Sequence, residues 1–348
     1  MPTLVEVAKA AGVSRSTAAR ALSGQPNVDA KTRARVLSTA EILGYRVNRM
    51  ASALRVGRSH LIGLVITNLV NASIQTVTQV VQAQARARGY QVLLGATQGD
   101  PEVEAKIVQT LVENRVDGLI LMGSDENTDQ TNGFVCEGLP VVNLIRRPSG
   151  SMAPSVLPDN HQSTYEATRY LLGLGHREIA FIGGPTDVAS GRERLAGYNA
   201  ALAEAGVQAQ EGLVRHGPFE PEFGSEAVTQ LYNSGKFFSA LVVANHEAIF
   251  GVLPQLVHEG VSIPDELSLV AIEDVPWFTA WHPPITVMDI NAALVGETAF
   301  ESLILQIDGE PQPVGSIIRP GVQLVVRGSC TSLAETITSG FRTPNILG

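Results

Sequence analysis

The side chains around residue 15 are of the kinds that contact DNA bases. Arg15, Ser16, Thr17 and Arg20 share the polar side of a segment whose apolar residues recur at helical spacing. An arginine at the start of such a helix can form paired hydrogen bonds to O6 and N7 of guanine. Any small helical bundle can show this spacing, however, so the assignment depends on the elements that position the four side chains.

These elements are predicted to be three helices. Thr3 and Glu6 have the pattern of a capping box at the start of a first helix. Ser14 is suited to cap a second helix over residues 15–22, and Asp29 a third. Two helices joined by a short glycine-containing turn are typical of the helix-turn-helix motif, whose second helix lies in the major groove of DNA. We expect the third helix to bury Val36, Leu37, Ala40 and Leu43.

The charge distribution supports a separate module for a polyanion. The 348 residues carry a formal charge of −9, but residues 1–60 hold ten lysines and arginines against three acidic residues. The remainder holds 15 basic and 31 acidic side chains. This division suggests a basic module, with an anionic partner for that module alone, joined to an acidic body. An ordinary basic surface arm is the alternative from charge alone, so the motif has to decide.

A second basic segment follows the three helices. Residues 48–55 can form one or two helical turns, which Asn48 would cap and which arginines flank. A helix of this length is unstable alone, so it is suited to fold only on DNA, where pairs of such helices can wedge into the minor groove. An ordinary basic linker is the alternative from the residues alone.

Residues 61–330 alternate short apolar runs with amphipathic stretches of helical length. This alternation predicts parallel sheets covered by helices on both faces, and the length suits two such units. Ligands of doubly wound sheets bind beyond the carboxyl ends of the strands. We therefore expect a three-helix head (1–46), a hinge and linker (47–60), an α/β body (61–330) and a flexible tail (331–348).

The chain carries no recognisable catalytic or metal-binding motif. Neither His246 nor His258, each followed by a glutamate, has the second histidine that a zinc-protease motif requires four residues on. Cys136 and Cys330 form no CxxC pair, which argues against a zinc ribbon and a disulfide framework. There is no nucleophile elbow and no Walker loop. These absences argue against an enzyme and indicate neither a metal nor a cofactor.

Over residues 3–330 the chain resembles the lactose-repressor/galactose-repressor (LacI/GalR) family of bacterial transcription regulators. The resemblance implies a homodimeric repressor that binds a pseudo-palindromic operator in double-stranded DNA and responds allosterically to a small effector. It also implies an all-α helix-turn-helix head and a two-lobed α/β body of parallel, doubly wound sheets, similar to periplasmic binding proteins. The segments that carry it are residues 5–14, 33–37, 43–46, 48–55, 174–184, 192–198, 243–245 and 282–286.

The resemblance assigns the positions that contact DNA. Leu54 matches the leucine that opens the central base step of an operator. Two departures are expected to weaken binding modestly: Ala19 lacks the hydroxyl that commonly reaches a phosphate, and Val47 replaces the usual proline before the hinge, which leaves the linker less rigid. The implied DNA contacts are Thr3, Ser14, Arg15, Ser16, Thr17, Arg20, Asn27, Tyr45, Asn48, Ala51, Leu54 and Arg55.

The resemblance also assigns an effector site between the lobes. Arg194 matches an arginine that commonly holds the effector, and Glu273 stands where an aspartate usually binds sugar hydroxyls. Phe219 matches an aromatic residue that packs against the ligand. From the residues alone, Arg194 and Glu273 can instead form a structural ion pair, and Phe219 can belong to the core. The implied effector contacts are Ile74, Ser124, Arg146, Arg147, Asp159, Arg194, Phe219, Asn245, His246 and Glu273.

Departures from the family pattern bear on the ligand. Arg146 and His246 each replace a usual aspartate, and the segment Asn71–Ile74 lacks a usual stacking aromatic. If Arg146, Arg147 and Arg194 converge, they suit a sugar phosphate or another anion. A neutral sugar, a nucleoside and a loss of ligand control stay open, as does the choice between induction and corepression.

Other protein classes fit the sequence less well. The chain begins without an apolar signal segment and has no run of the ~18 apolar residues that a membrane span needs. We therefore expect a soluble cytoplasmic protein with no membrane partner, which argues against a secreted solute-binding protein. The C-terminus has no leucine heptads, so a tetramer built on a coiled coil is not expected.

Overall fold

The computed structural model describes residues 2–22, 27–45, 58–310 and 312–333. The chain divides into two compact units, residues 1–60 and residues 61–348. The predicted hinge at 48–55 lies outside the described residues. None of the helices in the described ranges combines the length and the apolar character that crossing a membrane requires.

The head is a three-helix unit whose predicted caps are confirmed. Its helices are α1 (Leu4–Ala10), α2 (Arg15–Leu22) and α3 (Ala30–Ile42). The Thr3 hydroxyl accepts from the amide of Glu6, whose carboxylate accepts from the amide of Thr3 at 2.6 Å. The amide of Thr17 donates to Ser14 Oγ at 3.1 Å, and the amide of Thr32 to Asp29 Oδ1 at 2.9 Å. Each cap satisfies a backbone donor that a helix start leaves unpaired.

Of the four residues predicted to be buried by the third helix, two are buried and two are exposed. Val36 and Ala40 are buried, but Leu37 is 47% exposed and Leu43 38% exposed. The head core consists mainly of small side chains from α1 and α2, so α3 lies against them along one narrow stripe of residues four apart. Val28, before α3, is buried in the same core.

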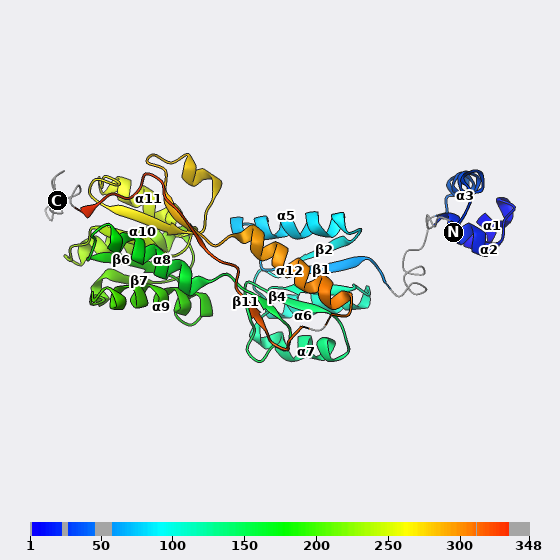
Figure 1. Cartoon of the computed structure of the whole chain (residues 1–348), viewed down its shortest axis with the longest axis horizontal. Helices are drawn as coiled ribbons and strands as arrows, with labels where there is room; N and C mark the ends of the chain where they lie inside the picture. The colour runs from blue at the N-terminus through cyan, green and yellow to red at the C-terminus, as the bar shows by residue number, and fades with distance from the viewer. Residues whose placement is uncertain (1, 23–26, 46–57, 311, 334–348) are drawn as a thin grey trace. The chain divides into compact units, whose positions relative to one another are not determined.

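The first lobe of the body is a six-stranded α/β unit. Its elements are β1 (Leu61–Ile66), α5 (Ala72–Ala87), β2 (Gln91–Ala96), α6 (Pro101–Glu113), β3 (Gly118–Leu121), the 3-10 turn η1 (Asp125–Asn127), α7 (Thr128–Cys136), β4 (Val141–Leu144), β5 (Ser155–Val156), α12 (Ala292–Ile307) and β11 (Ile317–Ile318). The strand order is β11-β5-β4-β3-β1-β2, with every neighbouring pair parallel. Helices α5 and α12 cover one face of the sheet, and α6 and α7 the other (Figure 1).

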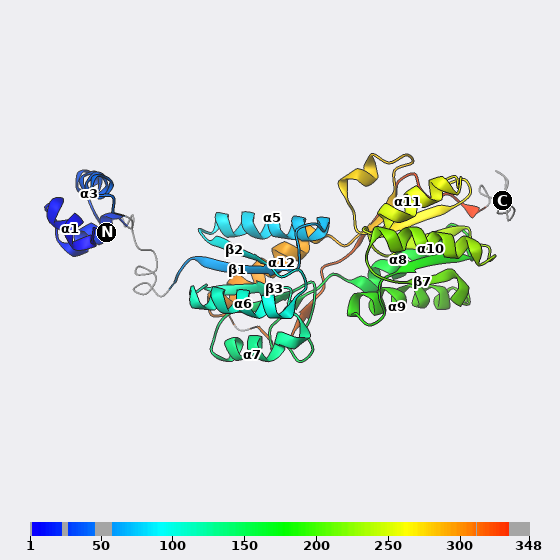
Figure 2. The ribbon, with the colours of Figure 1, turned by 180° about the vertical axis from the view of Figure 1, so that it is seen from behind.

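The second lobe repeats this architecture. Its elements are α8 (Asn160–Gly173), β6 (Ile179–Gly183), α9 (Ala189–Glu204), η2 (Glu211–Leu213), β7 (Val214–His216), α10 (Pro221–Asn233), β8 (Ala240–Val243), α11 (Ile249–His258), β9 (Ser268–Ile272), η3 (Pro276–Thr279), β10 (Thr286–Asp289) and β12 (Gln323–Val325). The strand order is β12-β10-β9-β8-β6-β7. Helices α10 and α11 cover one face, and α8 and α9 the other (Figure 2). The central strands are buried on both faces, as their continuous apolar runs predict.

The chain passes between the lobes three times. The passages are residues 157–159 after β5, residues 290–291 after β10 and residues 319–322 after β11. The last of them delivers β12, which pairs antiparallel with β10 and so departs from the predicted all-parallel sheet. A strand that enters directly from the other lobe needs no helical crossover, so it is free to run against its neighbour.

The last described residues are attached to the second lobe. The amide of Thr331 donates to Ser268 Oγ at 3.0 Å, and the amide of Leu333 donates to the Leu174 carbonyl at 3.0 Å. Residues 331–333 therefore belong to the body, contrary to the prediction that a tail begins at 331. The remainder of that predicted tail, residues 334–348, lies outside the described residues.

The close contact between α8 and α9 leads to a prediction about the free energy of unfolding. A Cβ atom added at Gly197 would lie 2.1 Å from the His161 carbonyl oxygen and 2.4 Å from Thr164 Oγ1. We expect Gly197→Ala to lower the free energy of unfolding by about 1–3 kcal/mol, because the two helices must move apart.

The matched control is Gly133→Ala in α7, where no atom lies within 4 Å of the added carbon. That change is expected to stabilise by roughly 0.5–1 kcal/mol, because alanine favours the helix interior. Urea denaturation of both variants measures the difference. Equal effects of the two substitutions would contradict the close packing.

Candidate functional site

Buried polar side chains gather at the carboxyl ends of the strands of the second lobe. Asn245 and His246 follow β8, and Glu273 follows β9. Arg194 reaches them from α9. The relative exposures are 4% for Arg194, 2% for His246 and 6% for Glu273, so their charges are removed from water and must be paired within the protein. We call Arg194, His246, Glu273 and their bonded partners Ser73 and Asn160 the Glu273 cluster.

Arg194 is held by three hydrogen bonds from its guanidinium. Nη2 donates to Glu273 Oε1 at 2.9 Å, Nε donates to Asn160 Oδ1 at 3.0 Å, and Nη1 donates to the Ala244 carbonyl. The ring of Phe219 lies 5.9 Å from the guanidinium carbon, within the range of a cation–π contact. Arg194 and Glu273 therefore form the buried ion pair that the residues alone allowed, and Phe219 covers it.

His246 completes the pairing of Glu273. Its Nδ1 lies 2.5 Å from Glu273 Oε2. Burial alone would lower the pKa of His246, but the facing carboxylate of Glu273 outweighs burial, and the pKa is raised. Burial alone would raise the pKa of Glu273, but His246, Arg194 and the Ser73 hydroxyl hold that pKa well below its usual range. Glu273 is therefore a carboxylate at neutral pH, and His246 favours its charged form.

Two contacts from the first lobe, one from α5 and one from its cap, were not anticipated from the sequence. Ser73 Oγ donates to Glu273 Oε2 at 2.8 Å, and Asn71 Nδ2 donates to Glu247 Oε1 at 2.9 Å. Asn160 at the start of α8 was also missed as the partner of Arg194. The only local signal was the polar pair of Asn71 and Ser73 beside Ile74, in the segment where the family usually has an aromatic.

The other predicted effector residues lie apart from the cluster or serve the backbone. Ile74 is 7% exposed and packs in the core of the first lobe. Asp159 caps α8, and the Asn245 side chain accepts from the amides of Glu247 and Ala248. Ser124 Oγ accepts from the Asn127 side chain.

Arg146 and Arg147 share no partner with Arg194. Both are exposed, and Arg147 Nη2 donates to the Gly315 carbonyl at 3.4 Å. The convergence of three arginines on one anion therefore stays a prediction that no contact among the described residues supports.

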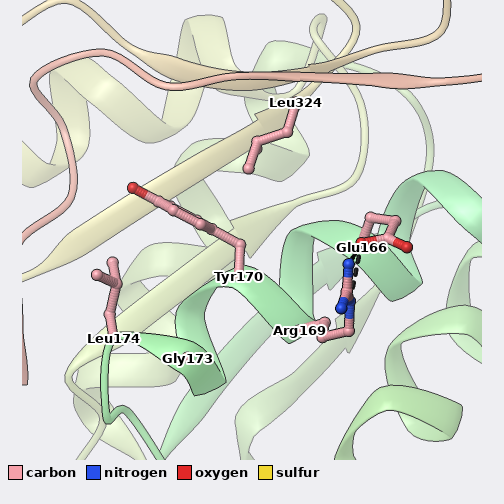
Figure 3. Close-up of a pocket in the computed structure, with 6 residues that line it drawn as sticks. All are labelled: Glu166, Arg169, Tyr170, Gly173, Leu174 and Leu324. Atoms are coloured by element: carbon pink, nitrogen blue, oxygen red, sulfur yellow. Dashed lines mark hydrogen bonds and ion pairs between the residues drawn. The ribbon is translucent and has the colours of Figure 1, made fainter.

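Two cavities elsewhere in the body are lined by none of the predicted effector residues. One of about 390 Å³ is lined by residues of α8, by Leu174 and by Leu324 of β12; Tyr170 and the mutually paired Glu166 and Arg169 belong to this lining (Figure 3). Another, of about 430 Å³, lies along β2 and α6. Among the described residues, no group of histidine, cysteine, aspartate and glutamate side chains is arranged to hold a metal ion.

The polar side of α2 is exposed in the head. Arg15, Ser16 and Arg20 are exposed and Thr17 is half-buried, while Ala18 and Ala21 face the core. Ser14 Oγ lies 2.9 Å from Ser16 Oγ and 2.8 Å from Thr17 Oγ1, so the hydroxyls at the helix start are ordered together.

The remaining residues predicted to contact DNA differ in their exposure. Thr3 and Asn27 are exposed and Tyr45 is half-buried. Ala19 is only 9% exposed, so a hydroxyl at that position would lie largely within the head. Asn48, Ala51, Leu54 and Arg55 lie outside the described residues.

The raised pKa of His246 makes the stability of the body depend on pH. A histidine whose pKa is higher in the folded than in the unfolded protein stabilises fully below its ordinary value of 6.5. That contribution is lost as the pH rises through the folded pKa. We expect the melting temperature of the unchanged protein to fall over this interval relative to that of His246→Asn, whose amide can replace the Nδ1 donor but does not titrate.

The pKa values of buried His176 and of exposed His216 are lowered, so the contributions of these two histidines have the opposite sign and act below pH 6.5. They are present in both proteins and cancel in the difference. If the difference in melting temperature between the two proteins stayed the same below and above pH 6.5, the raised pKa of His246 would be contradicted.

Comparisons with known proteins agree with this division of the chain. The family described as bacterial regulatory proteins, lacI family, matches residues 3–48. The family described as periplasmic binding proteins and sugar binding domain of LacI family matches residues 59–323. The HTH-type transcriptional regulator AscG of Escherichia coli (strain K12) is 32% identical over 312 residues, which are 89% of this chain and 93% of AscG.

Solved structures show the same fold. The lac repressor dimer bound to operator and the anti-inducer ONPF is similar, with a TM-score of 0.82, 26% identity and coverage of 95% of this chain and 99% of that one. The complex of the transcriptional regulator CelR with cellobiose has a TM-score of 0.69, 29% identity and coverage of 94% and 100%. The fold class and the family predicted from the sequence are confirmed: this chain belongs to the LacI family of bacterial transcription regulators.

Proposed function

We propose that this protein is a transcriptional repressor that binds a pseudo-palindromic operator as a homodimer, under the control of a small effector. The observation that carries the proposal is the exposed polar side of α2, where Arg15, Ser16 and Arg20 lie on a helix fixed by the Ser14 cap. A helix of a helix-turn-helix motif presents such a face to the major groove. The lac repressor, similar over 95% of this chain, was solved as a dimer on its operator.

The effector site is proposed between the lobes, at the Glu273 cluster. Arg194, Glu273 and Phe219 together offer charged hydrogen-bond partners and an apolar ring, which suits a polyhydroxylated ligand. CelR, of the same fold, binds cellobiose. A sugar or a sugar-derived molecule is therefore the proposed class, with a sugar phosphate or a nucleoside as alternatives that titration distinguishes.

In this proposal the head binds DNA and the body binds the effector, and no catalytic role is proposed for the body. The relatives are regulators, and the body of this protein is proposed to bind its effector without converting it. Since the DNA of a bacterium lies in the cytoplasm, the protein is proposed to act there.

Selection of operator sites tests the proposal directly. The full-length protein is mixed with random DNA at moderate salt, and the bound DNA is sequenced. We expect a pseudo-palindrome of about 14–20 base pairs with a flexible central step, because two heads read two half-sites and the hinges bend the middle. Enrichment only of single, unpaired half-sites would contradict the dimer, and no enrichment, with or without a metabolite extract, would contradict operator binding.

Arg15 is expected to read a base directly. Arg15→Ala should weaken binding to the selected site by ~1–3 kcal/mol while scrambled DNA of the same length loses less. Arg15→Lys is the matched control, because it keeps the positive charge but loses the planar fork that bonds guanine. Its binding to scrambled DNA should stay near that of the unchanged protein. Fluorescence anisotropy titrations measure both, and equal losses on both DNAs would assign Arg15 to phosphate contacts instead.

A further inference from the structure

Two side-chain hydrogen bonds connect the lobes directly. Ser73 Oγ donates to Glu273 Oε2 at 2.8 Å, and Asn71 Nδ2 donates to Glu247 Oε1 at 2.9 Å. Both donors lie at the N-terminal end of α5 in the first lobe. Both acceptors lie just beyond the carboxyl ends of strands in the second lobe, after β9 and β8. The chain thus joins its lobes by its own side chains at the place where the family holds a ligand.

The Ser73 bond is buried and charge-assisted. Ser73 is 8% exposed and Glu273 6%. Hydrogen bonds to ionised acceptors are stronger than neutral ones, and water competes little for a buried pair. The neighbouring hydroxyls of Thr76 and Thr78 bond back to carbonyls one turn earlier in α5, at 3.0 Å and 2.7 Å. Ser73, in the first turn of α5, instead bonds across to the other lobe.

The Asn71 bond is oriented by a helix cap. Asn71 Oδ1 accepts from the amide of Ile74 at 3.1 Å, which caps α5. Since the amide group is planar, this bond turns Nδ2 away from the helix and toward Glu247. Glu247 is held in turn, because its own amide donates to Asn245 Oδ1 at 2.7 Å. Backbone amides in both lobes therefore fix the positions of the two residues, Asn71 and Glu247, that form the second connection.

Glu273 also holds an unusual backbone conformation. Its φ is +75°, in the left-handed region that residues other than glycine rarely adopt. Such a conformation persists only where the surrounding contacts determine it, and it is found preferentially at ligand clamps and switch regions. Here Arg194, His246 and Ser73 bond the side chain, and the amide donates to the Met288 carbonyl at 2.9 Å.

We propose that Ser73 and Asn71 form a latch that holds the lobes together before any effector binds. The carboxylate of Glu273 connects the lobes as a bound ligand would, because it accepts hydrogen bonds from side chains of both lobes. An effector that inserts between the lobes must displace the Ser73 hydroxyl from Glu273 and supply its own bonds. Its apparent affinity is then lowered by the fraction of molecules that remain latched. This consequence for the effector rests on the proposed function; the latch itself does not.

The distance between the lobes tests the latch in the full chain. One spin label is attached to the exposed native Cys136 of the first lobe and another to Asp187→Cys, an exposed position of the second. Cys330 is changed to serine, whose hydroxyl can keep the bond to the Leu269 carbonyl. The labelled protein is diluted with unlabelled protein, so that pulsed electron resonance reads distances within one chain.

Two unlatching variants are compared with one control. Ser73→Ala removes the donor to Glu273. Asn71→Asp keeps the cap of α5, because aspartate caps as well as asparagine, but places a carboxylate against Glu247. The control is Thr76→Ala, which removes a hydroxyl from the same helix that bonds only within it. Melting curves of each variant establish that it is folded.

We expect one dominant, narrow distance in the unchanged chain and in Thr76→Ala, with only a minor second population. Each unlatching variant should raise a second population roughly tenfold, as the loss of one hydrogen bond to a charged group implies. Identical distributions in all four proteins would overturn the latch, as would a broad distribution in the unchanged chain. If Ser73→Ala does not fold, Asn71→Asp alone decides.

The result is independent of the operator selection. A chain that selects no DNA can still show the latch, and a chain without the latch can still select an operator. Failure of the inference is therefore distinguishable from failure of the proposed function.

Discussion

A buried carboxylate must be paired, and much of the body is arranged to pair Glu273. Taking an ion out of water costs several kcal/mol, and removing one partner of a buried pair costs about 3–5 kcal/mol. Arg194 therefore has to be buried with it, and the arginine in turn requires Asn160 and the Ala244 carbonyl. The ends of β8 and β9 and the helices α8 and α9 of the second lobe all supply groups to this one ion pair.

The same requirement extends to helix packing. Arg194 lies on α9 one turn before Gly197, where the missing side chain lets α9 approach the His161 carbonyl of α8. Thr164 Oγ1 on α8 donates to the Arg194 carbonyl at 2.6 Å, so the helix that carries the guanidinium is also held by its backbone. The close contact of the helices and the position of the charge are thus parts of one arrangement.

Sequence reasoning succeeded where the determinants are local and failed where they are not. The caps at Thr3, Ser14 and Asp29 involve residues three apart, and the apolar strands need only their own composition, so all were predictable. The exposed Leu37 and the attached residues 331–333 depend on what packs beside them, which no local pattern encodes. In the site, Arg194, His246 and Glu273 were assigned by resemblance, but their partner Ser73 lies 200 residues from Glu273 along the chain. That contact exists only because the two lobes meet there.

The ion pair and the proposed effector site are compatible descriptions of one set of residues. Without a ligand, the charged groups have to satisfy one another, which they do. A ligand changes the protein only to the extent that it binds one arrangement of the lobes more tightly than another. Here it must compete with bonds that the chain already makes between its lobes. The head precedes β1 of the first lobe along the chain, and the bonds from Ser73 and Asn71 start from α5 of the same lobe. Any coupling between effector and operator acts equally in both directions: the factor by which the effector changes operator affinity is the factor by which the operator changes effector affinity.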